Sequence, residues 1–212
     1  MNKKPSTSIQ MIADYEGDIT NLFKVEVNEE IPILATRNIV LFPGVISPIL
    51  VGRKVSINLI NHLKEAQDTT FAIFCQKDAN NDHPQQSDLY EYGVYAKLVR
   101  VLEMPGNDHN VTIIVQGLGR CRLTELTDTR PFLKGKTVAA NEEMPEEGDS
   151  EFKTALDDLR STTVDYIKQN EEIPDESQFA LNNIQNDIIT VDFICANLPF
   201  TIPDKFALRS TV

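Results

Sequence analysis

The sequence predicts an α+β protein in which a small β-barrel or sandwich, with one crossover helix, is followed by an all-α helical bundle. Short apolar runs separated by proline and glycine occupy residues 31–139, and apolar residues at helical spacing occupy residues 151–212. Between them, residues 140–150 are acidic and lack apolar periodicity. We therefore expect a β-rich domain, an acidic linker and a helical bundle, preceded at residues 1–30 by a flexible, polar N-terminal arm.

The first strands are expected on either side of a tight turn. Apolar runs at 31–34, 39–42 and 45–51 predict strands, and the Pro43-Gly44 pair between the last two predicts the turn. Proline fixes φ at the first central position of a type II turn, and glycine accepts the positive φ of the second position. This turn chemistry is sufficient to explain the Phe-Pro-Gly-Val sequence.

The rest of the β-rich half contains one helix and a series of strands. Apolar residues recur at helical spacing from residue 55 to residue 66, which predicts a helix after the first strands. The compact run at 70–75 predicts a buried strand, and the alternating residues at 94–103 predict a longer one. Three further strands are expected at 111–116, 121–126 and 132–138. About seven strands at this spacing predict a small closed barrel or sandwich.

Four helices are expected after the acidic linker. The first carries apolar residues throughout 152–167, and Ser150 stands where an N-cap is expected. A second helix follows, and a third has Asp187 as its candidate cap and ends before Pro199. A fourth begins near Thr201 and continues to the last residue. We therefore expect the bundle to be truncated within its last helix.

Charge is distributed unevenly along the chain. The net charge is −12 and the isoelectric point is near 4.7, which disfavours a general binder of polyanions. Residues 1–139 carry 15 basic and 16 acidic side chains, whereas residues 140–212 carry 5 basic and 16 acidic side chains. Nearly all of the excess acidity therefore belongs to the linker and the helical half.

Neither the termini nor the cysteines indicate export or membrane insertion. No stretch approaches the roughly 18 apolar residues of a membrane span, and the N-terminus lacks the apolar core of a signal peptide. We therefore expect a cytoplasmic protein without a membrane partner. Cys75, Cys121 and Cys195 are far apart and form no Cys-x-x-Cys motif, so they predict buried thiols in a reducing compartment.

Motifs for catalysis or metal binding are missing from the sequence. Gly135-Lys136-Thr137 matches the end of a P-loop, but Arg130 occupies the first glycine position and a strand surrounds the motif. There is no Gly-x-Ser-x-Gly nucleophile elbow. The histidines stand in polar surroundings without a suitably spaced nucleophile or metal ligand. We expect no catalytic residue, no metal site and no cofactor in this chain.

One stretch of the β-rich half is locally basic. Between Lys97 and Lys136 there are seven lysines and arginines against four aspartates and glutamates, and small barrels with basic strands can bind RNA. Few aromatic residues are available there for base stacking, so an ordinary barrel exterior is the favoured interpretation. RNA binding stays an alternative that the composition disfavours.

Four short blocks occur in a fixed order along the β-rich half. They are residues 31–53 with Phe-Pro-Gly at 42–44, the Gln-Lys-Asp at 76–78, residues 88–98 with Asp-Leu-Tyr-x-x-Gly-x-x-Ala, and residues 115–123 with Gly-x-x-Arg-x-Arg. In this order they resemble the N-terminal substrate-binding domain of the Lon ATP-dependent protease family. Gln116 stands where many members carry glutamate. The helical half, to about Leu208, is compatible with the family but weaker in pattern, and the arm before Ile31 lies outside the resemblance.

The resemblance implies a PUA-like β-domain and a helical bundle that recognise unfolded or degron-bearing proteins and assemble with other copies of the chain. It also implies that this chain is non-catalytic. Family members carry an ATPase module that uses ATP and Mg and a peptidase with a Ser-Lys dyad, and we expect both to be absent here. The alternatives are a stand-alone protein-binding module similar to the Lon N-terminal domain and a PUA-like RNA binder.

The candidate partner-binding residues surround the Pro43-Gly44 turn. They are Phe42, Pro43, Val45, Ile46 and Pro48, whose apolar area exceeds what a turn requires. Contiguous exposed apolar surface marks interaction sites, so we expect these side chains to bind substrate if they face solvent. Structural roles are expected for Gly44 in the turn, Gly93 in the third block, Gly117 at a bulge or bend, and Arg120 and Arg122 as holders of carboxylates or carbonyls at the joint between the two halves.

Overall fold

The computed structural model describes residues 11–12, 25, 30–66, 69–103, 110–140, 146, 148–170, 173 and 176–210, so most of the expected arm and linker lies outside it. The strands are β1 (Met11–Ile12), β2 (Ile31–Thr36), β3 (Val45–Val51), β4 (Thr70–Cys75), β5 (Tyr92–Glu103), β6 (Val111–Asp128) and β7 (Leu133–Ala139). The helices are α2 (Lys54–Glu65), the short 3-10 helix η1 (Gln86–Asp88), α3 (Ser150–Gln169), α4 (Glu176–Asn183), α5 (Asp187–Asn197) and α6 (Ile202–Ser210). The predicted α+β class is confirmed.

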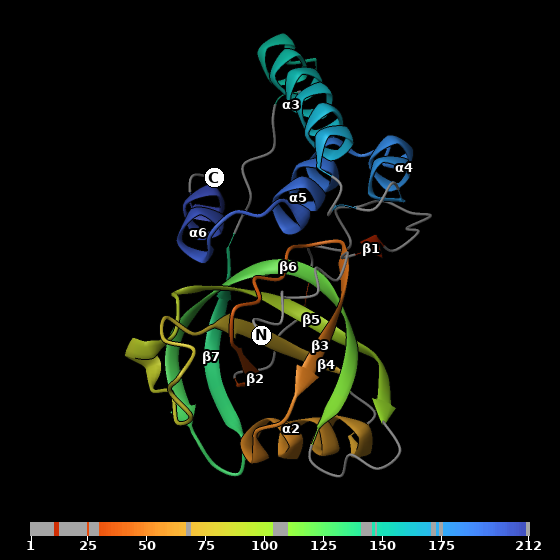
Figure 1. Ribbon diagram of the computed structural model, residues 1–212. Coiled ribbons are helices and arrows are strands. Elements are labelled where there is room, and N and C mark those ends of the chain that lie inside the picture. The colour runs from red at the N-terminus through yellow and green to blue at the C-terminus, as the bar shows by residue number, and fades with distance from the viewer. Residues whose placement is uncertain are drawn as a thin grey trace.

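The strands form a barrel-like sheet that closes on itself. The strand order is β1-β3-β6-β5-β4-β2-β7, and β7 pairs with β6 as well as with β2. The strands β6, β5, β4, β2 and β7 therefore form a closed ring, and β3 and β1 continue the sheet from β6 outside the ring. The β2–β4 pair is parallel, and α2 lies in the connection between these two strands. Figure 1 shows α2 across one end of the barrel and α3 to α6 beyond the opposite end.

The predicted crossover helix covers one end of the barrel core. Leu59, Ile60 and Leu63 are the buried apolar residues of α2. They belong to one cluster with apolar side chains of β2 to β6, among them Leu34, Phe71, Ile73, Val94, Ile113 and Val115. The spacing of the α2 residues puts them on one stripe of the helix, which is why the sequence pattern located this helix correctly.

The strands expected at 111–116 and 121–126 are a single strand, β6, of 18 residues. Residues 111–116 of β6 pair with β3 and residues 121–128 pair with β7, while β5 pairs with residues 111–122 along the other edge. Ala96 pairs with Gly117 but Val94 pairs with Arg120, so β6 bulges between these positions. The bulge bends the strand without ending it, because its hydrogen bonding resumes on both sides.

Residues 39–42, which were expected to form a strand, are not in one. Both edges of β2 are already occupied, by β4 on one side and β7 on the other, so no edge is left beside it. Asn38 has a positive φ of 59°, which turns the chain out of the sheet. The apolar side chains that follow, Val40, Leu41 and Phe42, are buried instead in contacts with other elements.

The helices of the second half pack mainly on each other and, through α5 and α6, on the barrel. Ile167, Leu181, Phe193 and Ile194 form a cluster among α3, α4 and α5. The caps are each one residue earlier than predicted, because Asp149 and Asn186 accept the hydrogen bonds from the first-turn amides of α3 and α5. Among the described residues, no helix is both long and apolar enough to cross a membrane.

Candidate functional site

The Pro43-Gly44 turn has the geometry expected of it but lies inside the molecule. The amide of Val45 donates to the carbonyl of Phe42 at 3.3 Å, and Gly44 has φ of +71°. Phe42 is 1% exposed and Val45 is fully buried, and Pro43 is buried as well. Their predicted role in substrate binding required that they face solvent, and the structure shows that these three residues do not.

Helices α5 and α6 cover the turn. Phe42 and Val45 share an apolar cluster with Cys195 and Ala196 of α5 and with Phe206 of α6. A Cβ atom on Gly44 would lie 2.9 Å from Cδ1 of Ile189, also on α5. A Cβ atom on Gly117 would lie 2.1 Å from the carbonyl oxygen of Phe42, so this position needs glycine because the backbone approaches so closely. Gly93 is similarly close to Ile73 and Phe74.

The two motif arginines have different surroundings. Arg120 donates to the carboxylate of Asp192 on α5 at 2.9 Å, and that carboxylate is 1% exposed, so this arginine lies at the joint between barrel and helices. Arg122 pairs with Glu91 at 3.3 Å, and both side chains are exposed. The expectation that Arg122 also lies at the joint is wrong, because its partner is on the surface of the barrel.

Ile46 and Pro48 lie on the opposite face of β3 from Val45, because successive side chains of a strand point to opposite faces. Both are half-buried, and Leu50, next on the same face, is 67% exposed. Neighbouring strands continue this surface, which we call the outer apolar face. It consists of Ile46, Pro48 and Leu50 on β3, Thr112 and Ile114 on β6, and Leu102 on β5.

The register of the three strands aligns these side chains in rows. Leu50 pairs with Thr112, which pairs with Leu102 on its other side. Pro48 pairs with Ile114, which pairs with Arg100. Paired residues in adjacent strands point to the same face, so the rows form one continuous surface. These apolar residues are partly exposed, so they do not form a core, and they lie next to one another. A continuous exposed apolar surface of this kind is typical of a contact surface.

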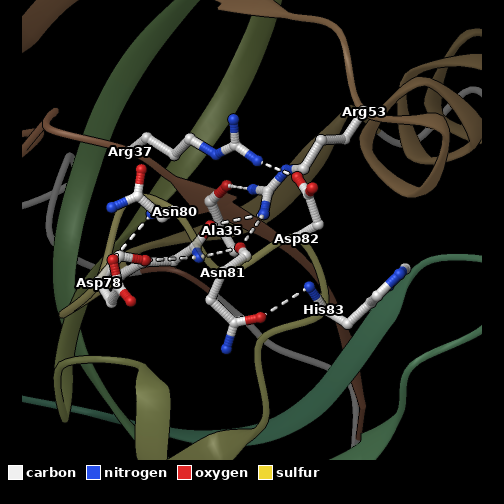
Figure 2. A network of polar contacts seen from close by, with 9 residues as sticks. Ala35, Arg37, Arg53, Asp78, Asn80, Asn81, Asp82 and His83 are labelled. Atoms are coloured by element: carbon white, nitrogen blue, oxygen red, sulfur yellow. Dashed lines mark hydrogen bonds and ion pairs between the residues drawn. The ribbon is translucent and has the colours of Figure 1, made fainter.

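A polar network lies next to Leu50, at the start of α2, and the sequence analysis did not assign it a role. Arg53 donates to the side-chain oxygen of Gln76 at 2.6 Å and to the carbonyls of Ala35 and Asn81. It thereby joins β2 and the 77–88 loop to the start of α2. Arg37 pairs with Asp82 of that loop, and Figure 2 shows the guanidinium groups of Arg37 and Arg53 side by side, with Asp82 next to them.

Burial and the neighbouring charges shift the pKa of Arg53. Burial lowers the pKa of Arg53, the adjacent positive charge of Arg37 lowers it further, and Asp82 raises it. The only sequence signal for this site was the Gly-Arg pair at 52–53 in the first resembling block. The residues that complete the network come from two other segments, 35–37 and 76–82, so a local pattern could not predict it.

A hollow of about 420 Å³ lies between this network and the outer apolar face. Arg37, Arg53 and Ser56 contribute polar groups to its walls, and Ile39, Ile49, Leu50 and Val51 contribute apolar ones. Within the described part of the chain, no three histidines, cysteines, aspartates or glutamates are grouped so that they could hold a metal ion. Cys75, Cys121 and Cys195 are free and buried.

Comparison with known proteins places these features in one family. A family model described as the ATP-dependent protease La (LON) substrate-binding domain matches residues 30–210. The Lon protease of Flavobacterium johnsoniae is 34% identical over 206 residues, which cover 93% of this chain and 25% of the relative. The Lon protease of Parabacteroides distasonis is 38% identical over 194 residues, which cover 91% of this chain and 23% of the relative.

The chain therefore spans about a quarter of the length of the curated relatives it matches. Among solved structures, the N-terminal domain of a Mycobacterium avium complex Lon protease has a similar fold, with a TM-score of 0.63 at 16% sequence identity. The superposition covers 86% of this chain and 90% of that chain. At this identity the likeness concerns the fold alone.

Proposed function

Because the chain belongs to the family of Lon substrate-binding domains, we propose that it is a non-catalytic module that recognises protein substrates through its outer apolar face. The observation that carries this proposal is the alignment of Leu50, Thr112 and Leu102 in one row across three strands. The proposal keeps Ile46 and Pro48 as contact residues and replaces the three buried turn residues with Leu50, Ile114 and Leu102.

The chemistry of the surface fits an unfolded polypeptide. Apolar side chains of such a chain lose contact with water when they cover Leu50 and Ile114, which is worth about 0.8 kcal/mol for each buried methylene. Ordering a flexible chain opposes this gain, so the affinity of one domain is expected to be roughly micromolar or weaker. Several tethered copies would raise the effective concentration of substrate, so weak contacts suffice.

The remaining activities of the family are proposed for other parts of a longer protein. In this proposal, ATP hydrolysis with Mg and peptide cleavage by a Ser-Lys dyad occur in modules outside this chain. The chain would contribute substrate capture and contacts with other copies of itself. We also propose a cytoplasmic location, which is supported by three free, buried thiols that suit a reducing compartment.

A charge introduced into the outer apolar face tests the proposal. Leu50→Asp should lower the affinity for a labelled unfolded polypeptide with blocked termini by on the order of tenfold, because the carboxylate must be desolvated on contact. Val138→Asp is the matched control, since Val138 is an exposed apolar residue of β7, away from this face. Binding is measured by fluorescence anisotropy, and circular dichroism checks the fold.

Two outcomes contradict the proposal. Leu50→Asp could be folded and bind the polypeptide as tightly as the unmodified protein, which would place recognition elsewhere. Phe179→Asp, which alters an exposed aromatic residue of α4, could instead abolish binding, which would place recognition on the helical half.

A further inference from the structure

Gly52, Arg53 and Ser56, at the start of α2, line the hollow beside the outer apolar face. This helix start lacks the side chains that usually cap the first amides of a helix. The N-cap residue is Arg53, whose side chain makes no capping hydrogen bond, and the first turn contains no acidic residue. The first amides of any α-helix have no partner within the helix and carry a partial positive charge. An anion is the ligand that this arrangement stabilises.

Ser56, in the first turn of α2, gives a second and independent indication of a ligand. Ser56 is only 7% exposed, and it lines the hollow. Among the residues that the structure describes, no hydrogen-bond partner is found for its hydroxyl. This hydroxyl is not among the fully buried side-chain atoms that lack a partner, so it is a part of Ser56 that reaches the hollow, where it can donate to or accept from a bound group.

The charges around the hollow favour an anion as well. Arg37 and Arg53 line it, and no carboxylate is among the described residues that do so. Asp82, which pairs with Arg37 (Figure 2), is not among the lining residues and supplies one negative charge against the two positive ones. The depressed pKa of Arg53 has the same origin, since burial and Arg37 both disfavour its charge. A bound anion would relieve this repulsion.

The other walls of the hollow are apolar, which narrows the class of anion. Ile39, Ile49, Leu50 and Val51 offer contacts to an aliphatic group and nothing to an inorganic ion. The hollow, at about 420 Å³, has room for an aliphatic side chain together with a carboxylate. Leu50 belongs both to these walls and to the outer apolar face, so a chain lying on that face can end in the hollow.

We propose that this hollow binds the C-terminal carboxylate of a substrate polypeptide whose last residue is apolar. The carboxylate accepts hydrogen bonds from Ser56, Arg37 and the first amides of α2, and the last side chain packs against Ile39 and Ile49. This inference rests on the proposed function, because the rest of the polypeptide is taken to lie on the outer apolar face. It adds a preference for free C-termini that an apolar face alone would not give.

The test compares two peptides of one apolar sequence ending in leucine, one with a free C-terminal acid and one with a C-terminal amide. Wild-type protein should bind the acid on the order of tenfold more tightly, because the amide removes a charge-assisted contact. Arg37→Gln and Ser56→Ala should each reduce this ratio toward one by weakening binding of the acid only. Arg122→Gln is the matched control, because Arg122 is also an exposed arginine paired with an exposed carboxylate and lies outside the hollow.

The outcomes separate this inference from the proposed function. Equal affinities for the acid and amide peptides, with Leu50→Asp still impairing both, would overturn the inference and leave the proposed function standing. Loss of the acid preference in Arg122→Gln would also overturn the inference, since the effect would then be one of overall charge. Failure of both peptides to bind would refute the proposed function, and the inference would fall with it.

A small probe tests the hollow without the outer face. Isovalerate, a branched carboxylic acid, should shift the backbone amide resonances of Val55 and Ser56 in wild-type protein and shift them less in Ser56→Ala. Inorganic phosphate at the same concentration and ionic strength should shift them less than isovalerate does. Larger shifts with phosphate would overturn the assignment to a carboxylate, because they would show a site for phosphate groups such as those of a nucleic acid.

Discussion

Arg120 of β6 and Asp192 of α5 form an ion pair of 2.9 Å that is almost completely removed from solvent. The two residues are 72 positions apart, and they join the barrel to the helical half beside the Pro43-Gly44 turn. Buried pairs of this kind are fixed in geometry because either charge alone would be strongly disfavoured. The joint between the two halves is therefore set by electrostatics as well as by apolar packing.

Asp192→Ala should lower the free energy of unfolding by about 3–5 kcal/mol, because it leaves the Arg120 charge buried without its carboxylate. Glu91→Ala, which breaks the exposed pair with Arg122, should lower it by less than about 1 kcal/mol. Urea titration followed by circular dichroism measures both. Similar losses in the two variants would show that the buried pair contributes no more than the surface pair.

Gly44→Ala should destabilise the protein by about 1–3 kcal/mol, for two reasons. Alanine disfavours the positive φ of +71° at this position, and its Cβ would lie 2.9 Å from Ile189. Gly148→Ala separates the two effects, because Gly148 also has a positive φ, of +90°, but nothing lies within 4 Å of its Cβ position. Thermal unfolding should show a larger loss for Gly44→Ala, and an equal loss would mean that the contact with α5 is unimportant.

Stability should fall at high pH because of Cys195. Burial, followed by the nearby negative charge of Asp192, raises the pKa of this thiol from 9.0 to about 11. The folded state therefore keeps the proton where the unfolded state has lost it. This contribution is fully present below pH 9 and is lost as the pH rises to about 11, by up to about 2–3 kcal/mol.

Urea titrations of wild-type protein and Cys195→Ala between pH 8 and about pH 11 isolate this effect. Lys205 also lies in this region, and burial lowers its pKa, so its contribution has the opposite sign. Cys195 raises the pKa of Lys205, so the difference between the two pH profiles reports the thiol together with its coupling to Lys205. Parallel profiles would show that Cys195 ionises equally easily in the folded and unfolded states.

RNA should bind weakly and only at low salt. Lys97 and Arg100 border the outer apolar face, so a single-stranded RNA can make a few phosphate contacts there. Such contacts lose most of their affinity between about 50 and 200 mM salt, whereas apolar contacts with a polypeptide do not. Filter binding across this range distinguishes the two ligands. RNA affinity that persists at the higher salt concentration would favour the PUA-like RNA-binding alternative.

Local patterns predicted the parts of the fold that local physics determines. Helix α2 and strand β4 follow from the spacing of their own apolar residues, and the Pro43-Gly44 turn follows from the φ preferences of two residues. The burial of Phe42 and Val45 could not be predicted in this way. It depends on Cys195 and Phe206, which are more than 140 positions later in the chain and cover the turn only after the helices pack.

Only part of the candidate site could be predicted from the sequence, because the rest depends on contacts between distant segments. The apolar character of Ile46 and Pro48 indicated contact residues, but they share this character with Val45, which lies on the opposite, buried face of β3. Leu102 and Ile114 joined the surface only through the pairing of β3, β6 and β5. Arg37, Arg53 and Ser56 carried no motif of their own, so only the structure assigned them to one hollow.

Closure of the barrel has a consequence for aggregation. Under the proposed function the protein meets unfolded chains, and an unpaired sheet edge would let such a chain add as a further strand, which leads to aggregation. In the described part of the sheet, both edges of β7 are occupied, and β3 is joined on its outer side only at Val45 and Ile46, by β1. Pro48, in the middle of β3, has no backbone N–H to donate to an incoming strand. Pro48 thus helps to form the apolar surface and also interrupts the edge beside it, so that, under the proposed function, a bound chain would not be added to the sheet at this position.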